Sequence, residues 1–242
     1  MLDQVDNWLT RFVPDRCVLC GLNAATGMLC AGCSADLPWI LSGCSRCSAP
    51  LPAGAPAGAC AGCDLVLRGI DRVRAALVYD FPVDSLVAAA KFRGRVECAR
   101  VLGDLLARSL TRDAKDVPGC DLVVPVPLHP DRFGRRGYNQ ASIIGRAAAR
   151  ATASLLDTKV CARRLNTPPQ SGMAGGARRA NVRGAFAARR DLEGLTIALV
   201  DDVITTGHTV SALAVALRRA GAAGVEAWCA ARVVAGQAPR KM

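Results

Sequence analysis

Two adjacent carboxylates follow an apolar run near the end of the chain. The stretch L-T-I-A-L-V-D-D-V-I-T-T-G-H-T-V covers residues 195–210 and places Asp201 and Asp202 at the end of a predicted buried strand. The Thr- and Gly-rich loop that follows leads into a predicted helix. Backbone N–H groups at a helix N-terminus, joined by Thr hydroxyls, bind phosphate, and Gly207 would let the backbone approach it closely.

The two acids would repel a bare phosphate, so their place directly before this loop needs a further explanation. Carboxylates suit ribose hydroxyls or a hydrated Mg²⁺ on the same ligand. The simpler alternative is an Asp cap followed by an ordinary helix start. That alternative explains one Asp and one Thr and leaves the other residues without a role. We therefore expect a ligand that carries a phosphate together with a sugar or a metal.

Eight of the twelve cysteines form four C-x-x-C pairs near the start of the chain. Two residues between thiolates let both sulfurs bind one tetrahedral zinc ion. A disulfide framework is disfavoured because the N-terminus is acidic and has no apolar signal region, and a thioredoxin-like site would need only one pair. The predicted zinc ligands are Cys17, Cys20, Cys30, Cys33, Cys44, Cys47, Cys60 and Cys63.

These ligands would hold one or two structural Zn²⁺ ions. In the simplest arrangement the first two pairs bind one ion and the last two bind another. An interleaved arrangement and a single site with spare thiols stay open. The other cysteines lie among apolar neighbours and are predicted to be core residues; they are Cys98, Cys120, Cys161 and Cys229.

Length, composition and charge narrow the class of protein. With 242 residues and 51% apolar residues, the chain can form one large domain or a main domain with a small appendage. It has no apolar run long enough for a membrane span, and we expect a cytoplasmic protein. Residues 1–65 have a net charge of −2 and the rest +13, from 28 basic and 15 acidic residues. This excess favours phosphate-rich partners, although a solvated basic surface would explain it equally well.

Strands and helices are predicted to alternate after the cysteine pairs. Strands are expected at 73–81, 121–127, 195–200 and 225–234, and helices at 83–93, 96–112, 138–156 and 209–220, with a polar turn between 127 and 138. This order indicates an α/β fold with a parallel sheet, in which ligands bind at the carboxyl ends of the strands. We expect a Cys-rich module at 1–65 and a second domain at 66–242, with a lead-in at 66–115 and a core at 116–234.

The motif I-A-L-V-D-D-V-I-T-T-G-H-T at 197–209 resembles the phosphoribosyl pyrophosphate (PRPP) signature of type I phosphoribosyltransferases. With the four C-x-x-C pairs, the chain resembles the ComF/GntX family of competence-associated, phosphoribosyltransferase-like proteins over about residues 17–232. Other family-like pieces are K-F-R-G at 91–94, V-P-V-P-L-H-P-D-R-F-G-R-R-G-Y-N-Q at 124–140, T-P-P-Q at 167–170 and R-R-A-N-V-R-G-A-F at 178–186. The resemblance implies a type I phosphoribosyltransferase-like fold.

The resemblance also implies a role for each matching residue. Asp201 and Asp202 would contact the ribose 2′ and 3′ hydroxyls at the catalytic centre. The 5′-phosphate would bind Thr205, Thr206, Gly207, His208 and Thr209. The pyrophosphate and a mobile loop at 163–183 would involve Lys91, Leu128, His129, Arg132, Arg135, Arg136 and Arg178. His208 stands where the family usually has a small residue, and we expect the loop to tolerate it because its grip is mostly through the backbone.

The implied reaction is displacement at the anomeric carbon of PRPP, with Mg²⁺ and basic side chains neutralising the departing pyrophosphate. The acceptor is not identified by the sequence. His129, the only histidine besides His208, is either a general base or a polar surface residue.

The alternative is a PRPP-sensing accessory of DNA uptake that performs no catalysis. The family's link with transformation adds single-stranded DNA and competence-machinery proteins to the expected partners. Residues 158–190 contain eight Lys or Arg residues and no acid, which suits a lid over pyrophosphate, a track for DNA or a solvated loop. Phe186 is the only aromatic residue there, so the stacking platforms of single-strand binders are nearly absent.

Overall fold

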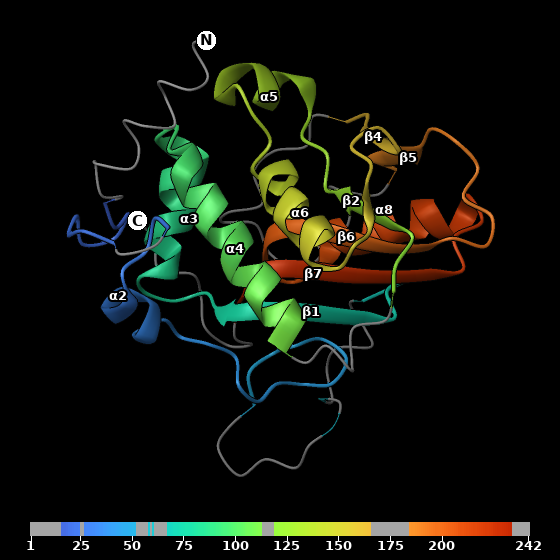
Figure 1. Ribbon diagram of the computed structural model, residues 1–242. Helices are drawn as coiled ribbons and strands as arrows, with labels where there is room; N and C mark the ends of the chain where they lie inside the picture. The colour runs from blue at the N-terminus through green and yellow to red at the C-terminus, as the bar shows by residue number, and fades with distance from the viewer. Residues whose placement is uncertain are drawn as a thin grey trace.

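The computed structural model describes residues 16–24, 27–51, 58, 60, 67–112, 119–165 and 184–233 (Figure 1). Its main sheet has five parallel strands in the order β1-β7-β6-β2-β3. The strands are β1 (Arg72–Val78), β2 (Leu122–Pro125), β3 (Leu155–Leu156), β6 (Thr196–Ile204) and β7 (Gly224–Arg232). The central strands are apolar on both sides, as expected for a sheet covered by helices on both faces.

Helices cover the two faces of this sheet unequally. Helices α3 (Val83–Phe92), α4 (Val96–Arg112) and α6 (Gln140–Ala151) lie on one face of the sheet (Figure 1). Their apolar residues pack in one cluster with Ala198 and Val200 of β6. On the other face, α8 (His208–Arg219) packs with Ile197 and Leu199. The predicted parallel α/β fold with flanking helices and a Cys-rich N-terminal module is therefore confirmed.

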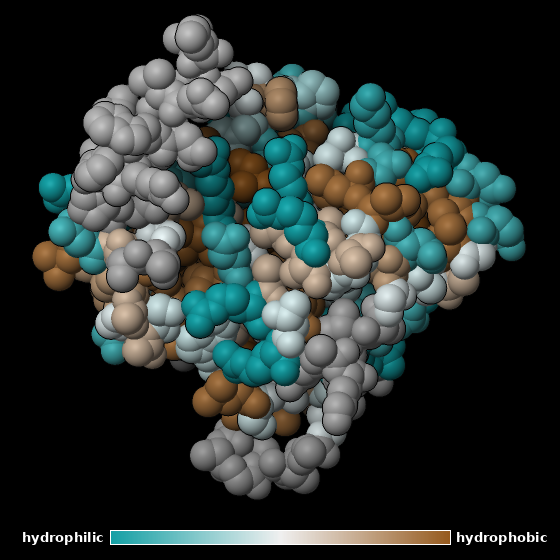
Figure 2. All heavy atoms as spheres, viewed as in Figure 1, coloured by the Kyte–Doolittle hydropathy of each residue, from teal (hydrophilic) through white to brown (hydrophobic). Residues whose placement is uncertain are grey.

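The Cys-rich segment packs along β1. Its short helix α2 (Ala31–Ala35) leads into an extended stretch that follows this strand. The Ile40 N–H donates to the Ala76 carbonyl at 3.0 Å, and the Val78 N–H donates to the Pro38 carbonyl at 2.8 Å. The Trp39 ring lies beneath the guanidinium groups of Arg108 and Arg112 of α4, 5.7 and 5.0 Å from its centre. In Figure 2, hydrophilic side chains run along the middle of this face, where Figure 1 places α4.

Several predicted boundaries differ from the structure. The helix predicted at 138–156 ends at Ala151, because Thr152 and Ala153, the latter with φ of 53°, turn the chain into β3. The strand predicted at 195–200 continues to Ile204 because it stays paired with β7 as far as Arg232. The strand predicted at 121–127 is shorter, Leu122–Pro125.

Several elements were not predicted at all. The expected polar turn contains α5 (Pro130–Arg136), which Pro130 starts and Gly137, at φ of 78°, ends. The basic segment contributes β4 (Cys161–Arg163) and β5 (Phe186–Ala188), which form a two-stranded antiparallel sheet. Arg163, expected to begin a mobile loop, is a buried residue of β4. Residues 166–183 of that expected loop, Arg178 among them, lie outside the described residues.

Candidate functional site

The two acids lie on opposite sides of β6, near the carboxyl edge of the sheet. Side chains alternate along a strand, and Ala198 and Val200 face α3, α4 and α6 while Ile197 and Leu199 face α8. Asp202 accordingly contacts α3 and α6 and is only 3% exposed, whereas Asp201 is partly exposed. The acids are thus within the strand, and not beyond its end as the sequence suggested.

Asp202 is held on both carboxylate oxygens. Lys91, in the last turn of α3, places its Nζ 2.9 Å from Oδ1, and the Gln140 Nε2 donates to Oδ2 at 2.9 Å. The Arg136 Nη1 donates to the Gln140 Oε1 at 2.5 Å, which extends the network to α5. The structure therefore joins three predicted site residues, Asp202, Lys91 and Arg136.

Gln140 links these residues and was not among the predicted site residues. The sequence offered one signal for it: Gln140 directly follows Asn139, a typical N-cap residue, and so begins a helix. Asn139 caps α6 by accepting a hydrogen bond from the Ala141 N–H at 3.1 Å. The Asn139 Nδ2 also donates to the Val126 carbonyl at 3.0 Å and so fixes the chain that leaves β2.

Asp201 has a different environment. Its Oδ1 accepts the Asp202 N–H at 2.9 Å, and within the described part of the chain its Oδ2 has no hydrogen-bond donor. Burial, followed by repulsion from the Asp202 carboxylate, raises the pKa of Asp201 to about 7. Asp201 can therefore gain or lose a proton near neutral pH, and its Oδ2 is available to a ligand hydroxyl or metal.

The loop after β6 has the features of a phosphate site. Gly207, with φ of 82°, is the N-cap of the 12-residue helix α8 and has no side chain of its own to cap it. The Thr206 hydroxyl is buried and has no hydrogen-bond partner among the described residues. Thr205 is exposed and Thr209 partly exposed, while His208 is buried at 8% exposure and begins the helix. The N–H groups at a helix N-terminus and the positive end of the helix dipole attract an anion.

The chain that follows β2 brings basic residues to the same edge. The Val126 N–H donates to the Val200 carbonyl at 2.9 Å, so this chain runs beside the acids of β6. His129 caps α5 by accepting the Asp131 N–H on Nδ1 at 3.3 Å, and Leu128 is partly buried beside it. Burial and repulsion from Arg136 and Arg135 lower the pKa of Arg132. An anion bound here would relieve that repulsion.

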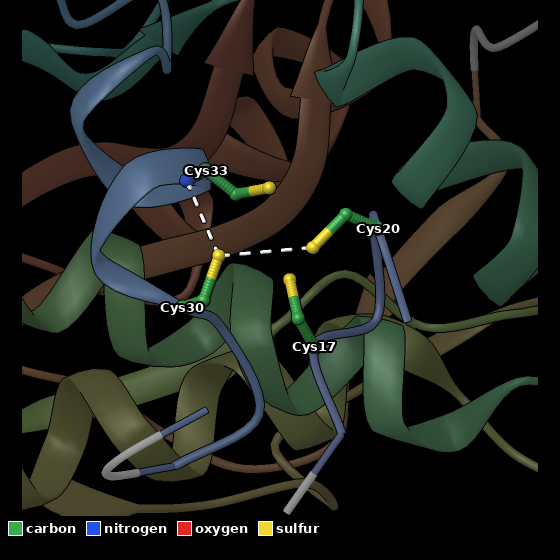
Figure 3. A group of neighbouring side chains, drawn as sticks. All are labelled: Cys17, Cys20, Cys30 and Cys33. Atoms are coloured by element: carbon green, nitrogen blue, oxygen red, sulfur yellow. Dashed lines mark hydrogen bonds between the residues drawn. The ribbon is translucent and has the colours of Figure 1, made fainter. Parts of the chain in front are cut away.

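The N-terminal cysteines form the first of two groups suited to zinc (Figure 3). The sulfurs of Cys17, Cys20, Cys30 and Cys33 lie within 4.8 Å of one another. Around a tetrahedral zinc with Zn–S bonds of about 2.3 Å, neighbouring sulfurs lie about 3.8 Å apart. The Cys20 and Cys30 sulfurs are 3.7 Å apart, which fits this geometry. Although burial acts in the opposite direction, N–H groups of Cys30, Cys20 and Leu19 lower the pKa of Cys17 to about 6, which favours a thiolate ligand.

The second group contains Cys44, Cys47 and Cys60, again within 4.8 Å. The Cys47 and Cys60 sulfurs are 3.6 Å apart, and the Cys44 sulfur accepts N–H groups of Cys47 and Cys60 at 3.4 and 3.1 Å. Cys63, the predicted fourth ligand, lies outside the described residues. The grouping supports the sequential arrangement over the interleaved one. Of the cysteines predicted to be core residues, Cys98, Cys161 and Cys229 are buried and Cys120 is partly buried.

Comparison with known proteins identifies the family. A DNA utilization protein YhgH of Salmonella typhi is 33% identical over 226 residues, which cover 92% of this chain and 99% of that protein. Competence protein F of Haemophilus influenzae is 30% identical over 232 residues, covering 93% and 100%. The chain belongs to the ComF/GntX family. The double zinc ribbon domain family matches residues 8–63, which supports zinc as the metal of the cysteine groups.

The chain also resembles a solved structure over part of its length. The glutamine PRPP amidotransferase of B. subtilis complexed with ADP and GMP matches with a TM-score of 0.36 and 23% identity, over 55% of this chain and 26% of that one. Within the ranges that the structure describes, no helix combines the length and the apolar character needed to cross a bilayer.

Proposed function

We propose that this protein binds PRPP at the carboxyl edge of its sheet. The observation that carries the proposal is the juxtaposition, around β6, of the N-terminus of α8 at Gly207 and the Asp201 carboxylate, whose Oδ2 accepts no hydrogen bond from the described residues. Lys91 and the arginines of α5 supply positive charge beside them. The helix N-terminus suits a phosphate, the Asp201 carboxylate suits a sugar diol, and the basic side chains suit a diphosphate.

Each part of PRPP has an assigned partner in this proposal. The 5′-phosphate binds residues 205–209, and the ribose hydroxyls bind Asp201, with Asp202 held behind it by Lys91 and Gln140. The diphosphate lies toward Arg132, Arg135 and Arg136, next to His129, which caps α5 and keeps these arginines in place. Bound Mg²⁺ would neutralise charge on the diphosphate, and Asp201 is the carboxylate placed to hold it directly or through water.

The proposed activity is displacement of diphosphate from the anomeric carbon by an acceptor that this site does not identify. The proposal includes a setting in DNA uptake or DNA utilisation, in the cytoplasm. The names of the relatives, DNA utilization protein and competence protein, support this setting.

A non-catalytic PRPP sensor that binds single-stranded DNA is the second candidate. One observation favours it: His129, the candidate general base, already uses Nδ1 to cap α5. Release of diphosphate from PRPP, screened over nucleobase and amine acceptors, separates the two candidates. An acceptor that raises release above the background supports the transferase, whereas PRPP binding without release for every acceptor supports the sensor.

Binding itself is tested by calorimetry with Gly207→Ala. This substitution strains a left-handed backbone position inside the proposed phosphate loop. Gly194→Ala is the matched control, because Gly194 has φ of 74°, has open space around its Cβ position and lies in the turn before β6. We expect Gly207→Ala to weaken PRPP binding at least about tenfold and Gly194→Ala to leave it unchanged. Equal losses in the two variants would refute the proposed site.

A further inference from the structure

Arg232, the last residue of β7, connects two parts of the molecule that are far apart in the sequence. Its side chain is only 9% exposed. The Nε donates to the Cys47 carbonyl at 3.1 Å, and the Nη1 donates to the Ile204 carbonyl at 2.9 Å and also to the Thr205 carbonyl. Among the residues that the structure describes, no carboxylate pairs with it. Its charge is therefore stabilised by backbone carbonyl groups.

The two ends of this connection are a zinc ligand and the proposed phosphate loop. Cys47 belongs to the second cysteine group, and Ile204 and Thr205 are the residues at which β6 turns into the loop before α8. Bound zinc fixes the Cys47 side chain and hence its carbonyl. A guanidinium is a planar, rigid fork of donors, so fixing one acceptor restricts the positions of the others.

Among the described residues, the first cysteine group has no comparable connection to the loop. Its neighbours Val18, Leu19 and Met28 pack with the cluster that contains α3, α4 and α6. Cys44 and Cys47 pack instead with the cluster that contains Ile204 and the apolar face of α8. The two groups therefore lie against opposite faces of the sheet, and within the described ranges it is the second group that shares a core with the loop.

We propose that Arg232 is a positioning residue that couples zinc binding at the second cysteine group to the order and phosphate affinity of residues 204–209. The inference rests on the proposed phosphate site. By linkage, a phosphate ligand on the loop also raises the zinc affinity of the second group and leaves that of the first unaffected. The connection turns a structural metal into a regulator of the binding site.

The test compares the full-length wild type with Arg232→Lys, Cys60→Ser and Cys20→Ser, each prepared in the presence of zinc. Arg218→Lys is the matched control, because Arg218 also donates to several carbonyls, those of Gly69 and Ala222 included, at the opposite end of α8. Hydrogen exchange of the loop amides measures the coupling without a ligand. We expect faster exchange in Arg232→Lys and Cys60→Ser and wild-type exchange in the Cys20→Ser and Arg218→Lys variants.

Affinity for ribose 5-phosphate and the zinc affinity of each cysteine group, measured by competition with a chelator, complete the test. Arg232→Lys should retain its zinc and bind ribose 5-phosphate about 5- to 30-fold more weakly, and ribose 5-phosphate should no longer raise the zinc affinity of its second group. Unchanged loop exchange and affinity in Arg232→Lys would overturn the coupling, and so would equal effects of Cys60→Ser and Cys20→Ser. If the variants change the hydrogen exchange of the loop as expected but the wild type binds neither ribose 5-phosphate nor PRPP, the coupling is supported and the proposed function is refuted.

Discussion

Replacing Asp201 with Asn is expected to stabilise the folded protein by an amount that grows with pH. Burial and repulsion from Asp202 raise the pKa of Asp201 from 3.8 to about 7 in the folded chain. Between these two values the folded chain keeps a proton that the unfolded chain has lost. The free energy of unfolding of the wild type therefore falls as pH rises from about 4 to about 7 and levels off just above 7. Asn does not titrate, so the Asp201→Asn variant does not show this fall.

The size of the effect follows from the two pKa values. A group that titrates at about 7 in the folded state and at 3.8 in the unfolded state lowers the free energy of unfolding by about 1.4 kcal/mol between pH 6 and pH 8. Well below pH 3.8 Asp201 is protonated in both the folded and the unfolded chain, so its titration does not change the free energy of unfolding there. Well above pH 7 it is deprotonated in both, and the loss levels off. The advantage of Asp201→Asn should thus increase by about 1.4 kcal/mol over this interval.

Urea unfolding of the zinc-loaded proteins at pH 6 and pH 8 measures this advantage. The difference between variant and wild type cancels the titration of groups that do not contact Asp201. Asp191→Asn is the control, because Asp191 is an exposed residue outside the site. The difference in free energy of unfolding between this variant and the wild type should be the same at both pH values. An Asp201→Asn advantage that is the same at both pH values would refute the account of this carboxyl.

Three further changes test other parts of the site and the fold. Arg132→Ala should weaken PRPP binding about 10- to 100-fold by calorimetry while ribose 5-phosphate binds as before, because only PRPP carries the diphosphate; equal losses for the two ligands would contradict the assignment. Gln140→Leu should lower the free energy of unfolding by about 1 to 3 kcal/mol in urea, because it leaves one oxygen of the buried Asp202 without its donor; a variant as stable as wild type would mean that Lys91 alone satisfies Asp202. Trp39→Ala should cost about 2 to 4 kcal/mol in the same assay without loss of zinc, since it removes ring packing and two cation–π contacts; accompanying loss of zinc would show that Trp39 supports the metal sites themselves.

Local patterns in the sequence were enough to predict the cysteine groups and the central strands. Two residues between cysteines determine a metal-binding turn whatever surrounds it, and the grouping of Cys17 with Cys30 and of Cys44 with Cys60 followed chain order. The uninterrupted apolar runs of β2 and of the first part of β6 indicated strands buried on both faces.

The features that were missed depend on contacts between distant segments. β6 continues through Asp201 and Asp202 because β7 pairs with it and because Lys91 and Gln140 compensate the buried Asp202 charge. No pattern within residues 195–204 contains that information. The pairing of β4 with β5 likewise joins segments more than twenty residues apart.

Helix α5 was missed for a different reason. Its start and end signals, Pro130 and Gly137, were present in the sequence, but a seven-residue helix shows too little periodicity to be recognised. The roles of His129 as its cap and of Arg136 as a partner of Gln140 become visible only once this helix is known. The assignment of residues to parts of PRPP stays a prediction.

The most direct test of the central claim is a ³¹P NMR titration of PRPP with the zinc-loaded protein in the presence of Mg²⁺. The 5′-phosphate and the two diphosphate phosphorus atoms give separate signals. The account predicts that the wild type shifts or broadens the 5′-phosphate signal and that Gly207→Ala abolishes this effect while Gly194→Ala retains it. A wild-type protein that leaves the 5′-phosphate signal unperturbed would contradict the proposed phosphate loop.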